Sequence, residues 1–302
     1  MVFAHYMVGL TYGQTVEDWA REIKLAHSAC IDGFALNIGP SDPYTLPQLR
    51  HAFEAASALS QQQQEEEGRT FTLFLSFDMA CGSWSVEQVV ELIDEFRSSP
   101  VYYAVDGLPF VSTFEGPGWA ENWGAVRRSI SGGIYLVPDW SSLGPEGVGR
   151  KLDVIDGAFS WAAWPRAGEG RITTVEDGLY RKALRGKAYM MGVSPWFYTR
   201  LPQWNKNWHC SGESLWFDRW AQILEHEPDF VQIITWNDFG ESSYICDPER
   251  PSQVVPGASE QEDIRGTLRQ RRIVPLLGIG RRQRLVVQME VGLSSRASHC
   301  LL

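Results

Sequence analysis

The stretch "FVQIITWNDFGESSY" (residues 230–244) changes from an apolar run to a cluster of aromatic and acidic residues. Its first part is rich in β-branched and aromatic residues, which are enriched in strands. A nearly continuous apolar run is typical of a strand that is buried on both faces of a parallel sheet. Asp238 and Glu241 follow directly. The stretch therefore predicts a buried strand whose carboxyl end carries carboxylates.

Seven similar apolar runs precede this stretch, each followed by a loop and a helix-like segment. They are residues 2–9, 33–39, 71–78, 109–114, 134–140, 157–163 and 188–196. Eight strands that alternate with helices over about 240 residues predict an α/β fold, a (β/α)8 TIM barrel. A doubly wound open sheet is the alternative.

Helix signals lie between these runs. Residues 15–29 open with Thr15 and carry Asp18 three residues later, a variant of the capping box. Apolar residues then recur at helical spacing. The other predicted helices are residues 46–62, 85–99, 119–130, 174–185 and 212–226, with a weak signal at 143–153. Residues 61–69, "QQQQEEEGR", are of low complexity and predict a solvated acidic loop before the third strand.

The predicted strand ends carry polar and aromatic residues. Active sites of (β/α)8 barrels lie at this end of the strands, and the 13 Trp of the chain can supply flat faces that stack on sugars. We therefore predict a carbohydrate cleft, although any strand end near solvent also turns polar. The candidate substrate-binding residues are His5, Asn37, Asp78, Glu115, Asp139, Trp140, Trp161, Trp164, Trp196, Trp236 and Asn237.

Composition excludes several other classes of protein. A net charge of −10 argues against a general binder of nucleic acid or anionic membranes. No apolar run approaches the roughly 20 residues of a membrane-spanning helix, and the first residues lack a signal-peptide pattern. That start predicts an intracellular protein or a missing N-terminus. The five cysteines and six histidines are scattered, so no metal site or cofactor is predicted.

The sequence changes character after Tyr244. Residues 245–302 contain nine Arg and no Lys, Trp, Phe or Tyr. We predict a catalytic barrel over residues 1–245 and an atypical Arg-rich tail over 246–302. Within the tail, residues 260–272 are a candidate last barrel helix, and the remainder is expected to be disordered. The last barrel helix is thus expected to be truncated or aberrant.

Asp238 and Glu241 are the candidate catalytic pair. Hydrolysis of a glycosidic bond uses two carboxyl groups, one to protonate the leaving oxygen and one to activate water or attack the sugar. Gly240 permits a sharp turn between them. The alternative is that Asp238 caps a turn and Glu241 is a solvated loop residue.

Ten segments, in order, resemble the fungal α-1,3-glucanases, or mutanases, of glycoside hydrolase family 71. They are "FAHYMVG", "IDGFALNIG", "LFLSFDM", "VSTFEG", "VPDW", "GAFSWAAWP", "SPWFYT", "NKNW", "LWFDRW" and "ITWNDFGESSYI". The resemblance covers residues 2 to 245. It implies a barrel enzyme that cleaves α-1,3-glucan of fungal walls with inversion, outside the cell or in the wall.

The acidic pair of the family's WND-x-GE motif falls on Asp238 and Glu241, and we favour Glu241 as the acid. The chain departs from the family pattern in its start, which lacks a signal-peptide pattern, and in its tail. The resemblance implies a β-rich accessory region after the barrel, which is expected to be truncated or aberrant here. A barrel hydrolase of another glucan and a non-catalytic relic that binds polysaccharide remain as alternatives.

Overall fold

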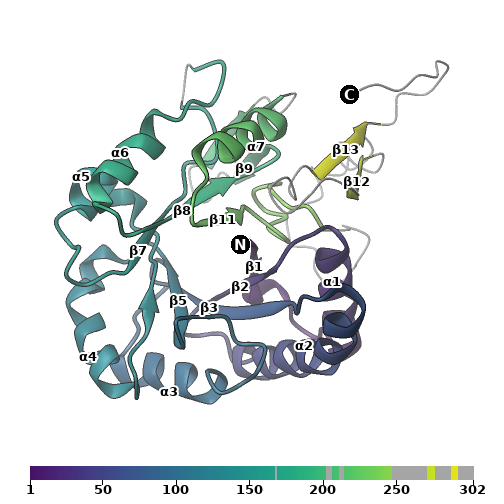
Figure 1. Cartoon of the computed structure of the whole chain (residues 1–302), viewed down its shortest axis with the longest axis vertical. Helices are drawn as coiled ribbons and strands as arrows, with labels where there is room; N and C mark the ends of the chain where they lie inside the picture. The colour runs from purple at the N-terminus through teal and green to yellow at the C-terminus, as the bar shows by residue number, and fades with distance from the viewer. Residues whose placement is uncertain (167–168, 202–205, 211–213, 247–270, 276–286, 292–302) are drawn as a thin grey trace.

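The computed structural model describes residues 1–166, 169–201, 206–210, 214–246, 271–275 and 287–291. Its main feature is a curled sheet with helices on the outer side (Figure 1). The eight predicted strands are confirmed, most of them shorter than the apolar runs. They are β1 (Val2–Met7), β2 (Gly33–Ile38), β3 (Thr72–Asp78), β5 (Leu108–Phe114), β6 (Tyr135–Leu136), β7 (Gly157–Ser160), β8 (Ala188–Val193) and β11 (Phe230–Ile233).

The strand order explains the curl of the sheet. The continuous order is β4-β5-β3-β2-β1-β11-β8-β7, with β6 also paired to β5. Every pairing in this sheet is parallel except that of β5 with β4 (Ala104–Val105). Beyond the end of β6, Asp139 forms isolated parallel bridges with both Phe114 and Phe159. This residue therefore links the end of β7, the last strand of the continuous order, to the end of β5, which lies next to β4 at the other margin.

Aromatic rings fill the inner side of the curled sheet near the beginnings of the strands. The ring centroids of Phe3 and Phe74 lie 4.9 Å apart, and those of Phe110 and Phe230 lie 5.1 Å apart. Phe110 belongs to β5 and Phe230 to β11, which are not neighbours in the sheet. Such a contact is possible only where the sheet curves round, so these rings mark its interior.

Helices alternate with the strands as predicted. They are α1 (Val16–Ser28), α2 (Thr45–Glu67), α3 (Val86–Phe96), α4 (Trp123–Ser129), α5 (Gly144–Val148), α6 (Val175–Leu184) and α7 (Leu215–His226), with short 3-10 helices η1 (Val8–Leu10), η2 (Pro117–Asn122) and η3 (Ser141–Leu143). The capping box of α1 is confirmed, because Thr15 and Asp18 accept each other's backbone N–H. None of the helices in the described part of the chain is both long and apolar enough to cross a bilayer.

The prediction of a loop at residues 61–69 is wrong. Helix α2 continues to Glu67 and ends at Gly68, which adopts a left-handed conformation with φ of 66°. Glutamine and glutamate are good helix formers, so a run of them extends a helix that already has a buried face. Gln63 is buried and accepts a hydrogen bond from the N–H of Phe71, the residue before β3.

Some elements have no counterpart in the sequence prediction. An antiparallel hairpin of β9 (Phe197–Leu201) and β10 (Lys206–Cys210) follows β8. Another antiparallel pair, β12 (Arg271–Pro275) with β13 (Val287–Val291), lies in the predicted tail. The helix predicted at residues 260–272 lies outside the described residues, apart from Arg271 and Arg272, which belong to β12.

Candidate active site

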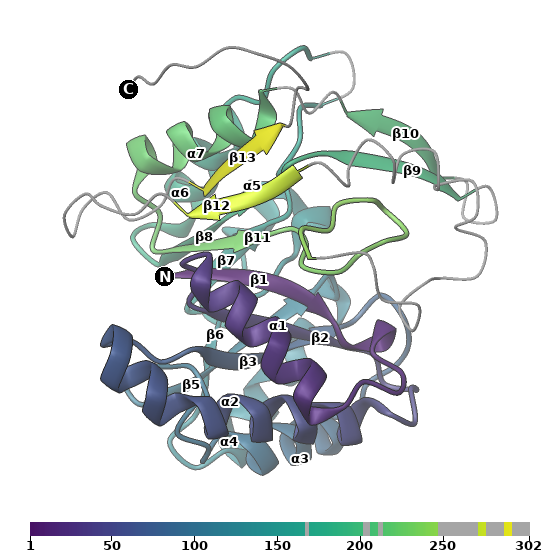
Figure 2. The ribbon, with the colours of Figure 1, turned by 90° about the vertical axis from the view of Figure 1, so that its right-hand side faces the viewer.

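The turn after β11 carries both candidate catalytic carboxylates. Asp238 donates its N–H to Thr235 Oγ1 at 2.8 Å, and its own Oδ1 accepts the N–H of Glu241 at 2.9 Å. Both residues are half-buried. Asp238 therefore caps this turn, as one interpretation of the sequence held, and the cap fixes the backbone of Glu241 beside it. The turn lies on the side toward which β1 and β11 run (Figure 2).

Asn237 anchors this turn to the first strand. Its Oδ1 accepts the N–H of Met7 at 2.7 Å, and its Nδ2 donates to the carbonyl of Met7 at 3.1 Å. The side chain is fully buried, with 0% of its surface exposed. The structure thus corrects the expectation that Asn237 contacts sugar, because both ends of its amide bind the backbone of β1.

The β8–β9 segment holds the other side of the turn. Trp196 donates its indole N–H to the carbonyl of Ser242, and Tyr198 donates its backbone N–H to the carbonyl of Glu241 at 3.2 Å. Trp164 in turn donates its indole N–H to the carbonyl of Trp196 at 3.1 Å. Two predicted platform residues, both half-buried, therefore lie in one hydrogen-bonded chain with the acidic turn.

Trp161 lies across the interior of the curled sheet. The centroid of its ring lies 5.0 Å from that of His5, in β1, and 4.8 Å from that of Phe114, in β5. His5 is buried, which lowers its pKa to about 3, and its Nδ1 accepts a hydrogen bond from Gln232 Nε2 at 3.1 Å. A neutral His5 therefore supports the half-buried Trp161 rather than serving as an acid near neutral pH.

Two further predicted carboxylates meet a pair of serines at the start of η3. Asp139 Oδ1 accepts hydrogen bonds from the N–H of Ser141 at 3.0 Å and from its hydroxyl at 2.5 Å. Glu115 accepts from the N–H of Ser142 at 3.0 Å and from its hydroxyl at 2.5 Å. The sequence analysis did not identify these serines as part of the site. The only signal in the sequence was their position directly after Asp139 and Trp140.

Burial raises the pKa of Asp139 to about 7. Hydrogen bonds from Ser141 oppose this rise, and the nearby Glu115 carboxylate adds to it. Asp139 is 0% exposed, so its carboxyl group has no direct contact with solvent. Its side chain belongs to the scaffold beneath the strand ends and not to the surface that a sugar would touch.

Asp78 and Asn37 lie at the ends of β3 and β2. Asp78 Oδ1 accepts the N–H groups of Ala80 at 2.9 Å and Cys81 at 3.1 Å, and burial raises the pKa of Asp78. Asn37 is buried beside Ser76 in the strand register. Its Nδ2 has no hydrogen-bond partner among the described residues.

Two predicted substrate-binding tryptophans are buried instead. Trp140 is 0% exposed and Trp236 is 3% exposed. The Trp236 indole donates to Glu22 Oε2 of α1 at 2.7 Å, and its ring packs against Phe34 at 5.1 Å. Trp236 therefore points to the helix layer, and neither buried tryptophan offers an exposed face to a sugar, contrary to expectation.

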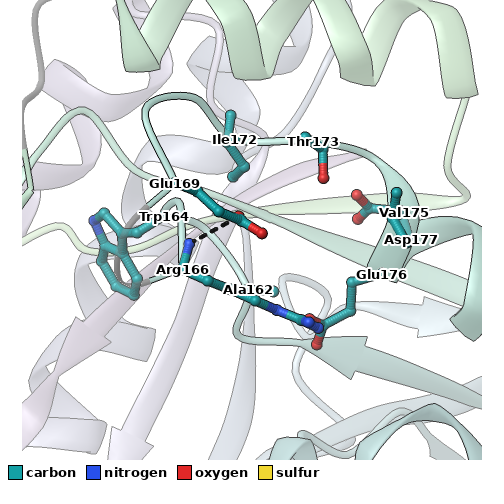
Figure 3. A pocket seen from close by; sticks show the side chains of 9 residues that line it. All are labelled: Ala162, Trp164, Arg166, Glu169, Ile172, Thr173, Val175, Glu176 and Asp177. Carbon is teal, nitrogen blue, oxygen red and sulfur yellow. Dashed lines mark hydrogen bonds and ion pairs between the residues drawn. The ribbon is translucent and has the colours of Figure 1, made fainter.

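A pocket lies between the loop after β7 and the first turn of α6 (Figure 3). Arg166 crosses it, since its guanidinium pairs with Glu176 at 2.6 Å and its backbone N–H donates to Glu169 at 3.2 Å. Trp164 also lines this pocket. Across the described ranges, no three His, Cys, Asp or Glu residues are grouped in a way that could hold a metal ion.

Solved glycoside hydrolases share this fold. A GH99 endo-α-mannosidase from Bacteroides thetaiotaomicron superposes with a TM-score of 0.64 at 14% identity, over 80% of this chain and 85% of that one. A GH5 cellulase from an Icelandic hot spring isolate gives 0.54 at 11% identity, over 85% and 82%. The curled parallel sheet with outer helices is therefore the α/β architecture of a class of glycoside hydrolases.

The chain belongs to glycosyl hydrolase family 71, whose model matches residues 1–264. It is 38% identical over 258 residues to the glucan endo-1,3-alpha-glucosidase agn1 of Schizosaccharomyces pombe, and 39% identical over 252 residues to a mutanase of Penicillium rubens. An ascus wall endo-1,3-alpha-glucanase of S. pombe is 32% identical. The matches cover 81% of this chain but 53–58% of the relatives, so the chain spans little more than half their length.

Proposed function

We propose that this chain carries the catalytic domain of a hydrolase that cleaves internal α-1,3-glucosidic bonds of fungal wall α-glucan. The observation that carries this proposal is the family match, which spans the acidic turn after β11. The names of the two Schizosaccharomyces pombe relatives supply the linkage and the endo mode of attack. The wall-associated name of one relative also supports an extracellular or cell-wall location.

The proposed scaffold is a (β/α)8 barrel formed by residues 1–245, with residues 246–302 as a separate tail. Pairing of β1 with β11 joins the beginning of the strand series to its end. The bridges of Asp139 to Phe114 and Phe159 support closure between β5 and β7. Likeness to GH99 and GH5 enzymes supports the same architecture.

Asp238 and Glu241 are the proposed acid–base pair. Glu241 donates its proton to the glycosidic oxygen as the bond from the anomeric carbon to that oxygen breaks. Water attacks the anomeric carbon from the opposite face and gives a proton to Asp238, which inverts the configuration. Fixed geometry supports these roles, since the hydrogen bond of Asp238 to the Glu241 N–H holds both residues on one turn.

Three half-buried tryptophans are the proposed sugar platforms: Trp161, Trp164 and Trp196. Aromatic side chains combine a large apolar face with a polar N–H group, and in Trp164 and Trp196 that group is already bound to backbone carbonyls. Asp78 and Glu115, at the ends of β3 and β5, are proposed to accept hydroxyl groups of the glucan.

Release of reducing sugar tests this function. Wild type, Asp238→Asn, Glu241→Gln and the control Glu17→Gln, a change in the first turn of α1, are compared on α-1,3-, α-1,4- and β-1,3-glucans. General acid–base groups contribute about 10²–10⁴-fold to rate, so the first two variants should lose that much on α-1,3-glucan while the control stays active. Near-full activity of both would refute the site, and a preference for another glucan would refute the substrate.

Proton NMR of the first product tests the mechanism, because inversion at an α-linkage releases a β-anomer. An α-anomer as first product would refute the inverting assignment. Size analysis of early products tests endo action: long oligosaccharides support internal cleavage, and glucose alone contradicts it.

A further inference from the structure

Asp139 occupies the position where three strand ends meet. Its N–H donates to the carbonyl of Thr113 at 3.2 Å, and the carbonyl of the preceding Pro138 accepts the N–H of Phe159 at 2.9 Å. The backbone around Asp139 therefore holds β5 and β7 together. A side chain at this point is fixed by strands on both sides.

The hydrogen bonds around Ser141 have a defined direction. A serine hydroxyl has one proton to donate and two lone pairs to accept with. Ser141 Oγ lies 2.5 Å from Asp139 Oδ1 and 2.9 Å from the backbone N of Trp161. The Trp161 N–H can only donate, so the Ser141 hydroxyl accepts from Trp161. The hydroxyl donates a hydrogen bond to Asp139 Oδ1, which also accepts the Ser141 N–H. A relay thus runs from Trp161 through Ser141 to Asp139.

The relay needs an acceptor at Asp139 but does not need a charge. Asp139 Oδ2 is buried and has no hydrogen-bond partner within the described part of the chain. An ionised carboxylate would leave that oxygen unsolvated, which is costly. The groups that face Asp139 are Glu115 at the end of β5 and Tyr180 of α6. Neither is a cation, so no counter-charge in this set offsets a negative charge on Asp139.

The relay ends at a residue that spans the interior of the sheet. Trp161 follows β7, and its ring reaches His5 of β1 and Phe114 of β5. Ser141 fixes the backbone of Trp161, while His5 contacts its ring. We infer that Asp139 is a positioning residue that acts through Ser141 to hold Trp161 in place beneath the substrate. The inferred benefit to sugar binding rests on the proposed function, but the relay itself does not.

Fluorine NMR of protein labelled with 5-fluorotryptophan tests the relay without substrate. The Trp161 resonance is assigned from the signal lost in Trp161→Phe. Asp139→Asn keeps an acceptor oxygen, so its Trp161 resonance should stay near the wild-type position. Ser141→Ala removes the relay and should shift or broaden that resonance. Ser142→Ala is the matched control, because its hydroxyl bonds to Glu115 instead. An unchanged resonance in Ser141→Ala would overturn the inference.

Kinetics on α-1,3-glucan separate positioning from catalysis. Asp139→Asn should lower kcat/KM less than about 10-fold, whereas loss of a general acid or base costs about 10²–10⁴-fold. Ser141→Ala should raise KM more than it lowers kcat. A loss above 100-fold in Asp139→Asn with an unchanged Trp161 resonance would make Asp139 a catalytic residue and overturn the inference. If wild type cleaves no α-1,3-glucan, the proposed function fails while the NMR result still decides the relay.

Discussion

Two adjacent residues of α6, Glu176 and Asp177, each form an ion pair with an arginine. The arginine is exposed in the first pair and buried in the second, so the two pairs should differ sharply in their contribution to stability. Asp177 binds Arg219 through two hydrogen bonds of 2.8 Å, and the side chains of Arg219 and Asp177 are 0% and 2% exposed. Tyr189 also donates to Asp177 Oδ1 at 2.7 Å. Asp177→Asn would leave the buried guanidinium without a counter-charge. Removal of one partner of a buried pair costs about 3–5 kcal/mol.

This cost is large beside the total free energy of unfolding. Folded proteins are typically stable by about 5–15 kcal/mol, so Asp177→Asn, at about 3–5 kcal/mol, should remove roughly a fifth or more of a stability in this range. Glu176→Gln is the matched control, since Glu176 pairs with an Arg166 side chain that is 68% exposed (Figure 3). An exposed pair contributes about 0–1 kcal/mol.

Urea unfolding followed by fluorescence measures both changes. The midpoint of Asp177→Asn should fall well below that of wild type with an unchanged slope, because the surface exposed on unfolding is the same. Glu176→Gln should unfold close to wild type. Equal losses in the two variants, or a loss below about 1 kcal/mol for Asp177→Asn, would refute the reasoning that burial decides the value of these pairs.

Other predictions concern the scaffold around the site. Burial raises the pKa of Asp139 to about 7, so this group contributes stability that is complete below its unfolded pKa of about 4 and is lost as the pH rises through 7. Urea unfolding should show a fall of about 1.4 kcal/mol per pH unit across that window, absent in Asp139→Asn. Trp236→Phe removes the donor to the buried Glu22 and should cost about 1–3 kcal/mol by urea unfolding, with KM for α-1,3-glucan unchanged. Thr15→Ala removes the capping box with Asp18, and thermal unfolding should report a loss of about 1 kcal/mol.

The strands could be predicted because each apolar run is long enough to be buried on both faces and is bounded by loop residues. The run that contains Phe230 shows this, since it became β11 between β1 and β8. The β9–β10 hairpin was missed because its signal merges with the apolar end of the preceding run. The segment around Gln63 was misjudged because polar composition alone does not separate a solvated loop from a helix with one buried side.

The candidate site was predictable only in part. Position after a strand predicted that Asp238 and Glu241 lie together at the end of β11, and one turn carries both residues. The direction of each tryptophan was not predictable, because the regular alternation of side chains ends where the strand does. Trp236 thus turns toward Glu22 of α1. Ser141 was overlooked because its role is to bridge Asp139 and Trp161, and these two residues lie close together only in the folded chain.

Pairing of β1 with β11 has a consequence for the order of events during synthesis. Val2 is in register with Val231, so the first strand gains this neighbour only after more than two hundred further residues have been made. At a synthesis rate of about 5–20 residues per second, one edge of β1 remains without this partner for roughly 10–50 s. Contacts of such sequence separation also slow folding. An apolar strand with an unpaired edge can pair with other chains, so β1 of the nascent protein is exposed to aggregation until β11 has been made.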